Sequence, residues 1–260
     1  MLEKLKPLIL LVLVISCTSE QNTVPQRPEP TPQPPFSGTI FLDPDIITAD
    51  DSSAFVSITA KGKGERTIYD RRVNDWITIF AHLFYIQYAD GLTMEAQVNP
   101  EFSDQEAAIE AEKYARAVGL LTTSLRKDVD ALWINKGTEL YGGGNRSILI
   151  HTGQTVEYER DGILEETLVH EATHTSLDDP HATHSGWLQA QEADNNYIST
   201  YARDYPLRED LAETYLLHLS LRHRRERISV DLANTILETI PNRLEYLDNL
   251  ALDMYPIVIE

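Results

Sequence analysis

The segment His170–His174, which reads HEATH, constrains this 260-residue chain more than any other stretch, because its spacing carries chemical meaning only on a helix. Three apolar residues four positions apart, Leu164, Leu168 and Ala172, predict a helix from about residue 163 to 176. Residues four apart on a helix share one face. The two histidines are therefore expected to lie side by side, one helical turn apart.

Two histidines in this arrangement can bind one Zn²⁺, each through a ring nitrogen, which is the chemistry of the HExxH motif. Glu171 lies beside that face, where it can act as a general base on a metal-activated water. The alternative is a chance occurrence of the pattern in an ordinary amphipathic helix. A zinc hydrolase also needs a third protein ligand and a donor to the developing oxyanion, so both must come from elsewhere in the chain.

A pair of glutamates on a second predicted helix can supply the third ligand. Asp204 is suited to cap this helix and Pro206 to occupy its first turn, and the helix is expected to reach about residue 225. Glu209 and Glu213 lie one turn apart on it. One could complete a His₂Glu zinc site while the other holds a ligand histidine by its outer N–H. Spacing leaves their order open, and two solvated helix glutamates are the alternative.

The HExxH motif, taken with the segment Tyr201–Glu213, resembles the catalytic domain of the anthrax lethal factor type, within the gluzincin metallopeptidases. The resemblance extends over about residues 163–220 and implies a zincin-like fold for the catalytic core. It implies one Zn²⁺ held by His170, His174 and Glu209, Glu171 as the base, Glu213 as the support of a ligand, and Tyr201 as the oxyanion donor. Tyr205 and Tyr197 are the alternative donors.

The remaining histidines fit a zinc site less well. The metzincin pattern requires Gly and His at two positions after the motif, and these hold Leu177 and Pro180. His181 and His184 are expected in a loop. His82 is expected to be a packed or surface side chain, and His151 has no partner at ligand spacing. His181, His184, Asp178 and Asp179 are the next candidates if the second helix supplies no ligand.

The first 35 residues predict export and membrane anchoring. Residues 1–16 combine two lysines with a short apolar run, too short to span a bilayer, and resemble a lipoprotein signal peptide. Cys17, the single cysteine, lies where a lipobox requires it, so acylation is expected and no internal disulfide is possible. A plain signal peptide with an incidental cysteine is the alternative. The proline-rich segment 17–35 predicts a tether, and the resemblance to such lipoproteins implies the bacterial outer membrane of the cell envelope.

Residues 36–260 are expected to form one α+β domain. The formal charge of the whole chain is −19, which argues against nucleic acid as a partner, because phosphate contacts require Lys and Arg. Strands are predicted at 39–42, 54–59, 76–88, 92–98, 129–135 and 147–151, with a loop at 61–64 and a turn at Asp90-Gly91. Further helices are predicted at 103–118, which begins with a capping box at Ser103 and Glu106, and at 229–240 and 241–252. The glycines at 142–144 permit a sharp loop or a close approach of the backbone. The strand at 147–151 could either bind an extended peptide along its edge or lie within the core.

Two functions remain open from the sequence. The first is a zinc metallopeptidase or related amide hydrolase that acts on peptides or proteins at the cell envelope. The second is a non-catalytic surface-binding lipoprotein that keeps the zincin fold. Glu171 favours the first, because a binding module has no chemical need for a base at that position.

Overall fold

The computed structural model describes residues 33–42 and 46–258. The chain divides into two units, Met1–Thr31 and Pro32–Glu260, and the description below concerns the second. The predictions for the signal peptide, for Cys17 and for most of the tether lie outside the described residues.

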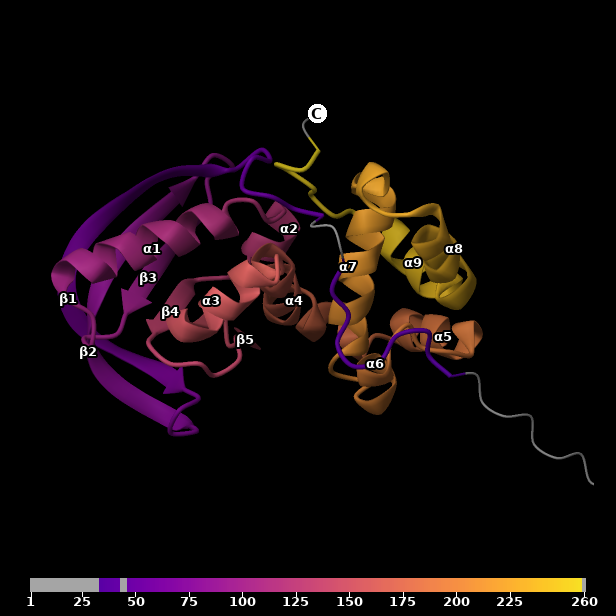
Figure 1. Ribbon diagram of the computed structural model, residues 1–260, viewed down its shortest axis with the longest axis horizontal. Helices are drawn as coiled ribbons and strands as arrows, with labels where there is room; N and C mark the ends of the chain where they lie inside the picture. The colour runs from indigo at the N-terminus through magenta and orange to yellow at the C-terminus, as the bar shows by residue number, and fades with distance from the viewer. Residues whose placement is uncertain (1–32, 43–45, 259–260) are drawn as a thin grey trace, which may run out of the picture. The chain divides into compact units, whose positions relative to one another are not determined.

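The second unit has the expected α+β class, with a mixed six-stranded sheet and a set of helices (Figure 1). The strands are β1 (Phe55–Asp70), β2 (Asp75–Tyr88), β3 (Thr93–Val98), β4 (Ala131–Asn135), β5 (Gly142–Gly144) and β6 (Ser147–His151). The α-helices are α1 (Asp104–Val118), α2 (Thr123–Arg126), α3 (Thr152–Arg160), α4 (Leu164–Ser176), α5 (Ser185–Asp194), α6 (Thr200–Asp204), α7 (Asp210–His223), α8 (Val230–Thr239) and α9 (Pro241–Asp248). A π-helical turn η1 (Asp178–Ala182) and a 3₁₀ turn η2 (Arg225–Arg227) complete the set.

The sheet has the strand order β1-β2-β3-β4-β6-β5. The first three strands are antiparallel, β4 and β6 continue in parallel, and β5 returns antiparallel to β6 at the edge. The predicted strands at 76–88, 92–98 and 129–135 are confirmed to within about two residues, and Gly91 occupies the predicted turn with a φ of 86°. The strand predicted at 147–151 is β6, which lies between β4 and β5 in the sheet. Its pairing with β5 covers the outer edge from Ser147 to Leu149, so a peptide cannot pair with that part of β6.

Two sequence expectations for the first strands are wrong. The loop predicted at 61–64 lies inside β1, because a bulge between Ala60 and Gly62 absorbs the glycine at a φ of 81° and the pairing with β2 continues. Residues 39–42 form no strand. Their backbone bonds instead to side chains: the N–H of Ile40 donates to Glu213 and that of Leu42 to Glu166, at 3.0 and 2.7 Å.

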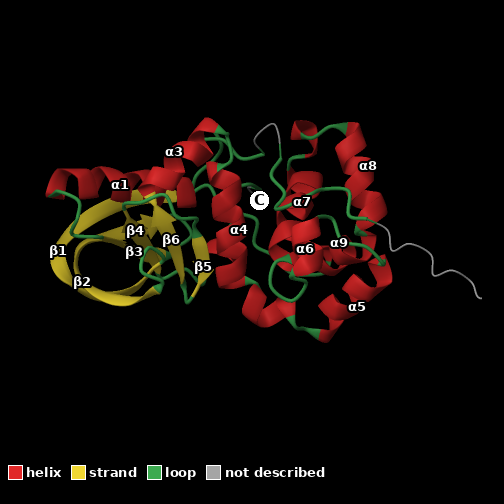
Figure 2. Cartoon of the chain, turned by 60° about the horizontal axis from the view of Figure 1, so that its bottom comes forward, coloured by secondary structure: helices red, strands yellow, loops and turns green. Residues whose placement is uncertain are grey.

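The main hydrophobic core lies between the helices and one face of the sheet, where α1, α3 and α4 run along the same side (Figure 2). The predicted capping box of α1 is confirmed: Ser103 accepts from the N–H of Glu106, whose side chain accepts in return from Ser103. A smaller cluster of Ile68, Ala131, Trp133 and Leu149 covers part of the opposite face. The edge strand β5 contacts α4 on one side and Leu149 of this smaller cluster on the other.

Several helices differ from expectation. Helices α2, α3 and α5 were not predicted, and α9 ends at Asp248 instead of about residue 252. The helix expected from Asp204 begins only at Asp210, after α6 and a turn. Asp210, the first residue of α7, pairs with the fully buried Arg243 at 2.8 Å, and Arg243 also pairs with Asp194 at 2.9 Å. This ion pair fixes the first residue of α7 against α5 and α9.

Within the described residues, no helix is long and apolar enough to cross a membrane.

Candidate metal centre

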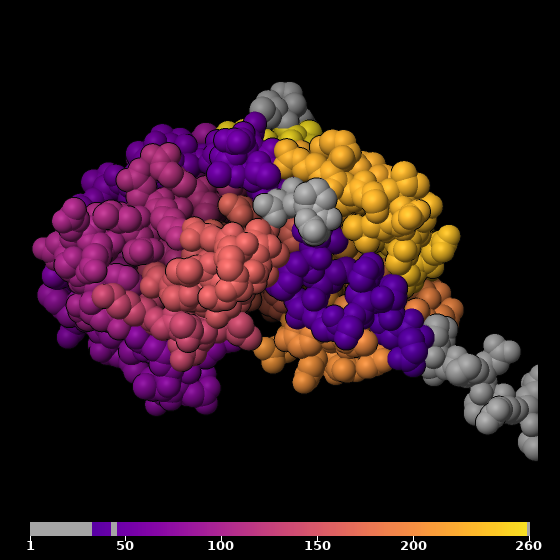
Figure 3. Space-filling model, viewed as in Figure 1, coloured from indigo at the N-terminus to yellow at the C-terminus, as the bar shows by residue number. Residues whose placement is uncertain are grey.

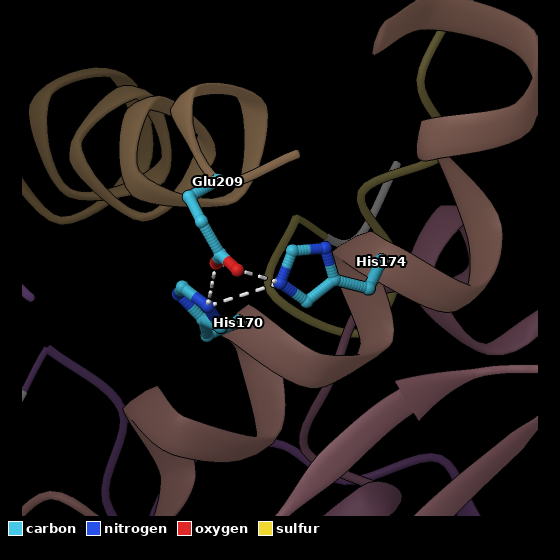
Figure 4. Close-up of side chains that lie close together, drawn as sticks. All are labelled: His170, His174 and Glu209. Carbon is cyan, nitrogen blue, oxygen red and sulfur yellow. Dashed lines mark hydrogen bonds and ion pairs between the residues drawn. The ribbon is translucent and has the colours of Figure 1, made fainter. Parts of the chain in front are cut away.

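Three side chains converge on one point between α4 and the start of α7 (Figure 4). The Nε2 atoms of His170 and His174 are 3.1 Å apart. The Oε2 atom of Glu209 lies 3.3 Å from the first and 3.2 Å from the second. The structure therefore brings together the three residues for which the sequence and the resemblance predict zinc binding.

The local fold explains how each ligand reaches this point. The two histidines lie on successive turns of α4, as the apolar periodicity predicts. Glu209 is not inside a helix, contrary to expectation, but is the residue that precedes the first turn of α7. Its N–H donates to Tyr205 and its carbonyl accepts from Glu213, both within 2.9 Å. The buried pair between Asp210 and Arg243 then holds the adjacent residue in place.

A carboxylate lies near the outer nitrogen of each histidine, but only Asp178 is within hydrogen-bond distance. Asp178 lies 2.7 Å from Nδ1 of His174, and Glu213 lies 3.8 Å from Nδ1 of His170. The position of Glu213 agrees with the supporting role that the resemblance implies. Asp178 was expected only as a substitute ligand, although its spacing of four residues from His174 is the signal in the sequence that indicates this contact. Such outer carboxylates fix the ring orientation and raise the basicity of a ligand histidine.

The segment 33–42 supports Glu213 from the other side. Its residues lie on the surface in front of α6 and α7, where they are coloured indigo (Figure 3). The backbone of Phe36 bonds to Ile198 and Thr200, and Ile40 donates to Glu213. Ser199 donates a second hydrogen bond of 2.7 Å to the same carboxylate oxygen. The segment 33–42 is therefore part of the scaffold of the site.

The protonation of the site shows that it attracts positive charge. Burial lowers the pKa of His174, but hydrogen bonds to Asp178 and Glu209 outweigh burial and raise that pKa to about 10. Burial also opposes ionisation of Glu209, yet the two histidines hold its pKa well below the usual range. Burial raises the pKa of Glu213 to about 7. These shifts mean that a protonated His174 and an ionised Glu209 attract each other, and binding of a metal ion at the same atoms would require the imidazole to lose that proton.

The donor set fits a zinc ion. Ligand atoms that each lie about 2.0–2.1 Å from a tetrahedral Zn²⁺ are separated from one another by roughly 3.3–3.4 Å. The three observed separations of 3.1, 3.2 and 3.3 Å are close to that value. Two imidazoles and one carboxylate are also a donor set that catalytic zinc sites use, with a fourth position left for water or substrate.

A cavity of about 330 Å³ opens onto this cluster. Glu171 and Tyr201 line it together with the three candidate ligands, so the predicted base and the predicted oxyanion donor face the same space. Burial and the nearby Glu209 raise the pKa of Tyr201 to about 12, which keeps its hydroxyl protonated. The alternative donors do not line the cavity: Tyr205 is exposed, and Tyr197 packs against the guanidinium of Arg243 at 4.7 Å.

The other histidines take no part in the cluster. His181 bonds to the hydroxyl of Tyr246 at 2.9 Å, and His184 caps α5 through its ring nitrogen. His82 and His151 are buried in β2 and β6, and Nε2 of His82 lies 2.9 Å from the carbonyl oxygen of Phe102.

The edge strand β5 reaches the site because it consists of glycine. A Cβ atom at Gly143 would lie 2.0 Å from the carbonyl oxygen of Glu171 and 2.9 Å from Cβ of His174. Both neighbours belong to the rigid helix α4, so no side chain fits at this position. Glycine therefore sets how closely the sheet edge approaches α4, which carries His170 and His174.

We expect Gly143→Ala to lower the free energy of unfolding by at least about 2 kcal/mol, because overpacking against backbone forces β5 away from α4. Gly142→Ala is the matched control, since its new methyl group would lie too close only to the end of the flexible Arg71 side chain, at 2.8 Å, and would touch Leu149 at an ordinary contact distance of 3.7 Å. Urea denaturation of both variants measures the difference. Equal stabilities would contradict the close packing of Gly143.

Comparisons with protein-family models, with curated proteins and with solved structures give no significant match to this chain.

Proposed function

We propose that this protein is a zinc metallopeptidase of the gluzincin type, with a zincin-like catalytic domain that hydrolyses peptide or related amide bonds. The observation that supports the proposal is the convergence of His170, His174 and Glu209, with Glu171 in the same cavity. The two flanking carboxylates, Asp178 and Glu213, add support, because ligand histidines usually carry such partners.

The proposed roles follow from position and chemistry. His170, His174 and Glu209 would hold the ion, and a bound Zn²⁺ supplies a Lewis acid that polarises a carbonyl and activates water. Glu171 takes the proton from the attacking water and passes it to the nitrogen of the departing amine. Tyr201 donates its hydroxyl hydrogen to the oxygen that becomes negative as the carbonyl carbon turns tetrahedral.

Two measurements on the purified full chain test the proposal. Elemental analysis should find one zinc per chain, and a mixed peptide pool should be cleaved in a manner that a chelator abolishes and added Zn²⁺ restores. Zinc at one per chain without cleavage of any peptide would favour a non-catalytic binding module instead. The absence of tightly bound zinc would remove the basis of the proposal.

We also propose that Cys17 is acylated and that the protein is anchored at the cell envelope, at the outer membrane. This rests on the lipobox-like sequence alone. Cys17→Ser should block acylation, so the protein should leave the membrane fraction or remain unprocessed. Fractionation of cells that express each form, with mass analysis of the N-terminal peptide, measures this. A variant that is still found as a mature membrane protein would contradict the assignment.

A further inference from the structure

A second cavity, of about 210 Å³, lies against β5 outside the metal centre. Tyr69, Trp76 and Trp133 line it, with Trp76 packed edge-to-face against Tyr69 and Trp133 at centroid distances of 5.7 and 5.4 Å. Trp76 is 48% exposed, which is high for so large an apolar side chain. No aspartate or glutamate among the described residues lines this cavity. Arg71, Asn145 and Ser147 also line it, so the cavity combines an aromatic wall, suited to an apolar or aromatic group, with three polar side chains.

The two cavities meet along β5 and at Arg71. The three glycines of β5 and Arg71 line both cavities. Gly143 presents one side to α4, whereas Gly142 presents the opposite side to Arg71, whose Nη2 atom lies 2.8 Å from where a Cβ would stand. Thus β5 is the wall between the cavities, and the guanidinium is placed at the rim that they share.

Arg71 has no ion-pair or hydrogen-bond partner among residues 33–42 and 46–258. Two other arginines nearby do have ion-pair partners. Arg72 pairs with Asp70 and Glu101, and Arg208, the other arginine of the larger cavity, pairs with Glu209 at 3.1 Å. In a chain with a formal charge of −19, an unpaired arginine beside a candidate catalytic cavity is unusual. A planar guanidinium with free donors matches a carboxylate.

The free edge of β5 provides the link between these features. The two-residue turn Asn145-Arg146, with φ of 51° and 56°, makes Gly144 and Ser147 the first pair of the hairpin. The N–H of Gly144 donates to Oγ1 of Thr175 at 2.8 Å. Gly143 is the next residue along β5, opposite Ile148, and in a regular antiparallel ladder the N–H and C=O of a residue at that position point away from the partner strand. A peptide strand paired there would direct successive side chains to opposite sides of β5. One side chain would enter the aromatic cavity, and the next would face the metal centre.

We propose that the aromatic cavity is a substrate subsite for a large apolar or aromatic side chain, and that Arg71 binds the carboxylate of an acidic residue adjacent to it in the peptide. This inference rests on the proposed peptidase function and specifies its substrate class. The side chains of two adjacent residues of a bound peptide would point to opposite sides of β5. Arg71 lines both cavities, so its guanidinium is next to either side.

Peptide binding to the zinc-loaded Glu171→Gln protein tests the inference without turnover. The probes are blocked hexapeptides of alanine that contain Phe-Glu or Glu-Phe at the centre, and the same peptides with Gln or Lys in place of Glu. In calorimetry, one Glu peptide should bind at least about tenfold more tightly than its Gln counterpart, as expected for a hydrogen-bonded charge pair. Arg71→Ala should abolish that ratio, and Arg71→Glu should make the Lys peptide the tightest.

Two further variants separate the parts of the subsite. Trp76→Ala should weaken both Phe peptides and leave the ratio of Glu to Gln affinities unchanged. Arg160→Glu, on the exposed end of α3 and away from both cavities, is the matched control for charge reversal and should bind as the parent does. Equal affinities for Glu and Gln peptides, or no binding of any peptide, would overturn the inference.

Cleavage by the otherwise unaltered enzyme distinguishes this inference from the proposed function. Cleavage sites in a mixed peptide pool should carry an acidic residue next to an apolar one, and Arg71→Glu should shift the acidic preference to lysine. Efficient cleavage without any acidic preference would refute the subsite and leave the peptidase proposal intact. Arg71-dependent binding without cleavage would refute the peptidase and leave a binding site for acidic peptides.

Discussion

Replacement of Glu171 by Gln is expected to leave one zinc per chain and to reduce peptide hydrolysis by about 10²–10⁴-fold, the usual contribution of a general base. Glutamine has nearly the same shape as glutamate, so the cavity and the adjacent ligand His170 should keep their positions. Its amide oxygen cannot accept the proton of the attacking water at neutral pH. Elemental analysis and initial rates on the same peptide pool give the two quantities.

Glu192→Gln is the matched control for this change, because Glu192 lies exposed on α5 and does not line the cavity. It should retain both the zinc and the rate. If Glu171→Gln keeps its metal and cleaves peptides at a rate near that of the parent, another group takes the proton. Loss of zinc in that variant would instead mean that Glu171 contributes to the stability of the metal centre.

Local periodicity was sufficient to predict the part of the site that one helix contributes. The spacing of Leu164, Leu168 and Ala172 placed His170 and His174 on one face, and the structure has them there. The capping box at Ser103 and the turn at Gly91 were equally local and equally well predicted. In each case the residues that decide the conformation lie within about one or two turns of one another.

Contacts between distant segments were not predictable in this way. The start of α7 at Asp210 is paired with Arg243, which is more than thirty residues away along the chain. Nothing in the local sequence around Arg243 indicates that contact. The segment 39–42 looks like a strand because it is apolar, but its N–H groups bond to buried glutamates and not to a neighbouring strand. Composition does not distinguish these two ways to satisfy an extended backbone.

The glycines of β5 show the same limit. Their sequence allowed either a sharp loop or a close approach of the backbone, and only the position of α4 decides that Gly143 serves the second purpose. Arg71 had no recognisable signal, because its importance comes from a missing partner and from its place between two cavities.

The two glutamates near α7 differ in what they touch, so their substitutions should differ in effect. Glu209→Ala removes one of three candidate ligand atoms, and it should abolish stoichiometric zinc binding. Glu213→Gln keeps an oxygen for the N–H of Ile40 and the hydroxyl of Ser199 but loses the charge beside His170. For such an outer partner, zinc affinity typically falls by about 10–100-fold. Competition with a zinc chelator of known affinity measures both variants.

The choice of Gln at residue 213 keeps metal affinity separate from folding. Glu213→Ala would leave the buried N–H of Ile40 without its acceptor, which typically costs about 1–3 kcal/mol and could lower zinc affinity through the fold alone. Thermal denaturation of the metal-free proteins checks that Glu209→Ala and Glu213→Gln remain folded. If the Glu213 variant loses zinc while the Glu209 variant binds it normally, the two roles are reversed. If both folded variants bind zinc as the parent does, α7 does not supply the third ligand, and Asp178 becomes the first alternative because it already contacts His174.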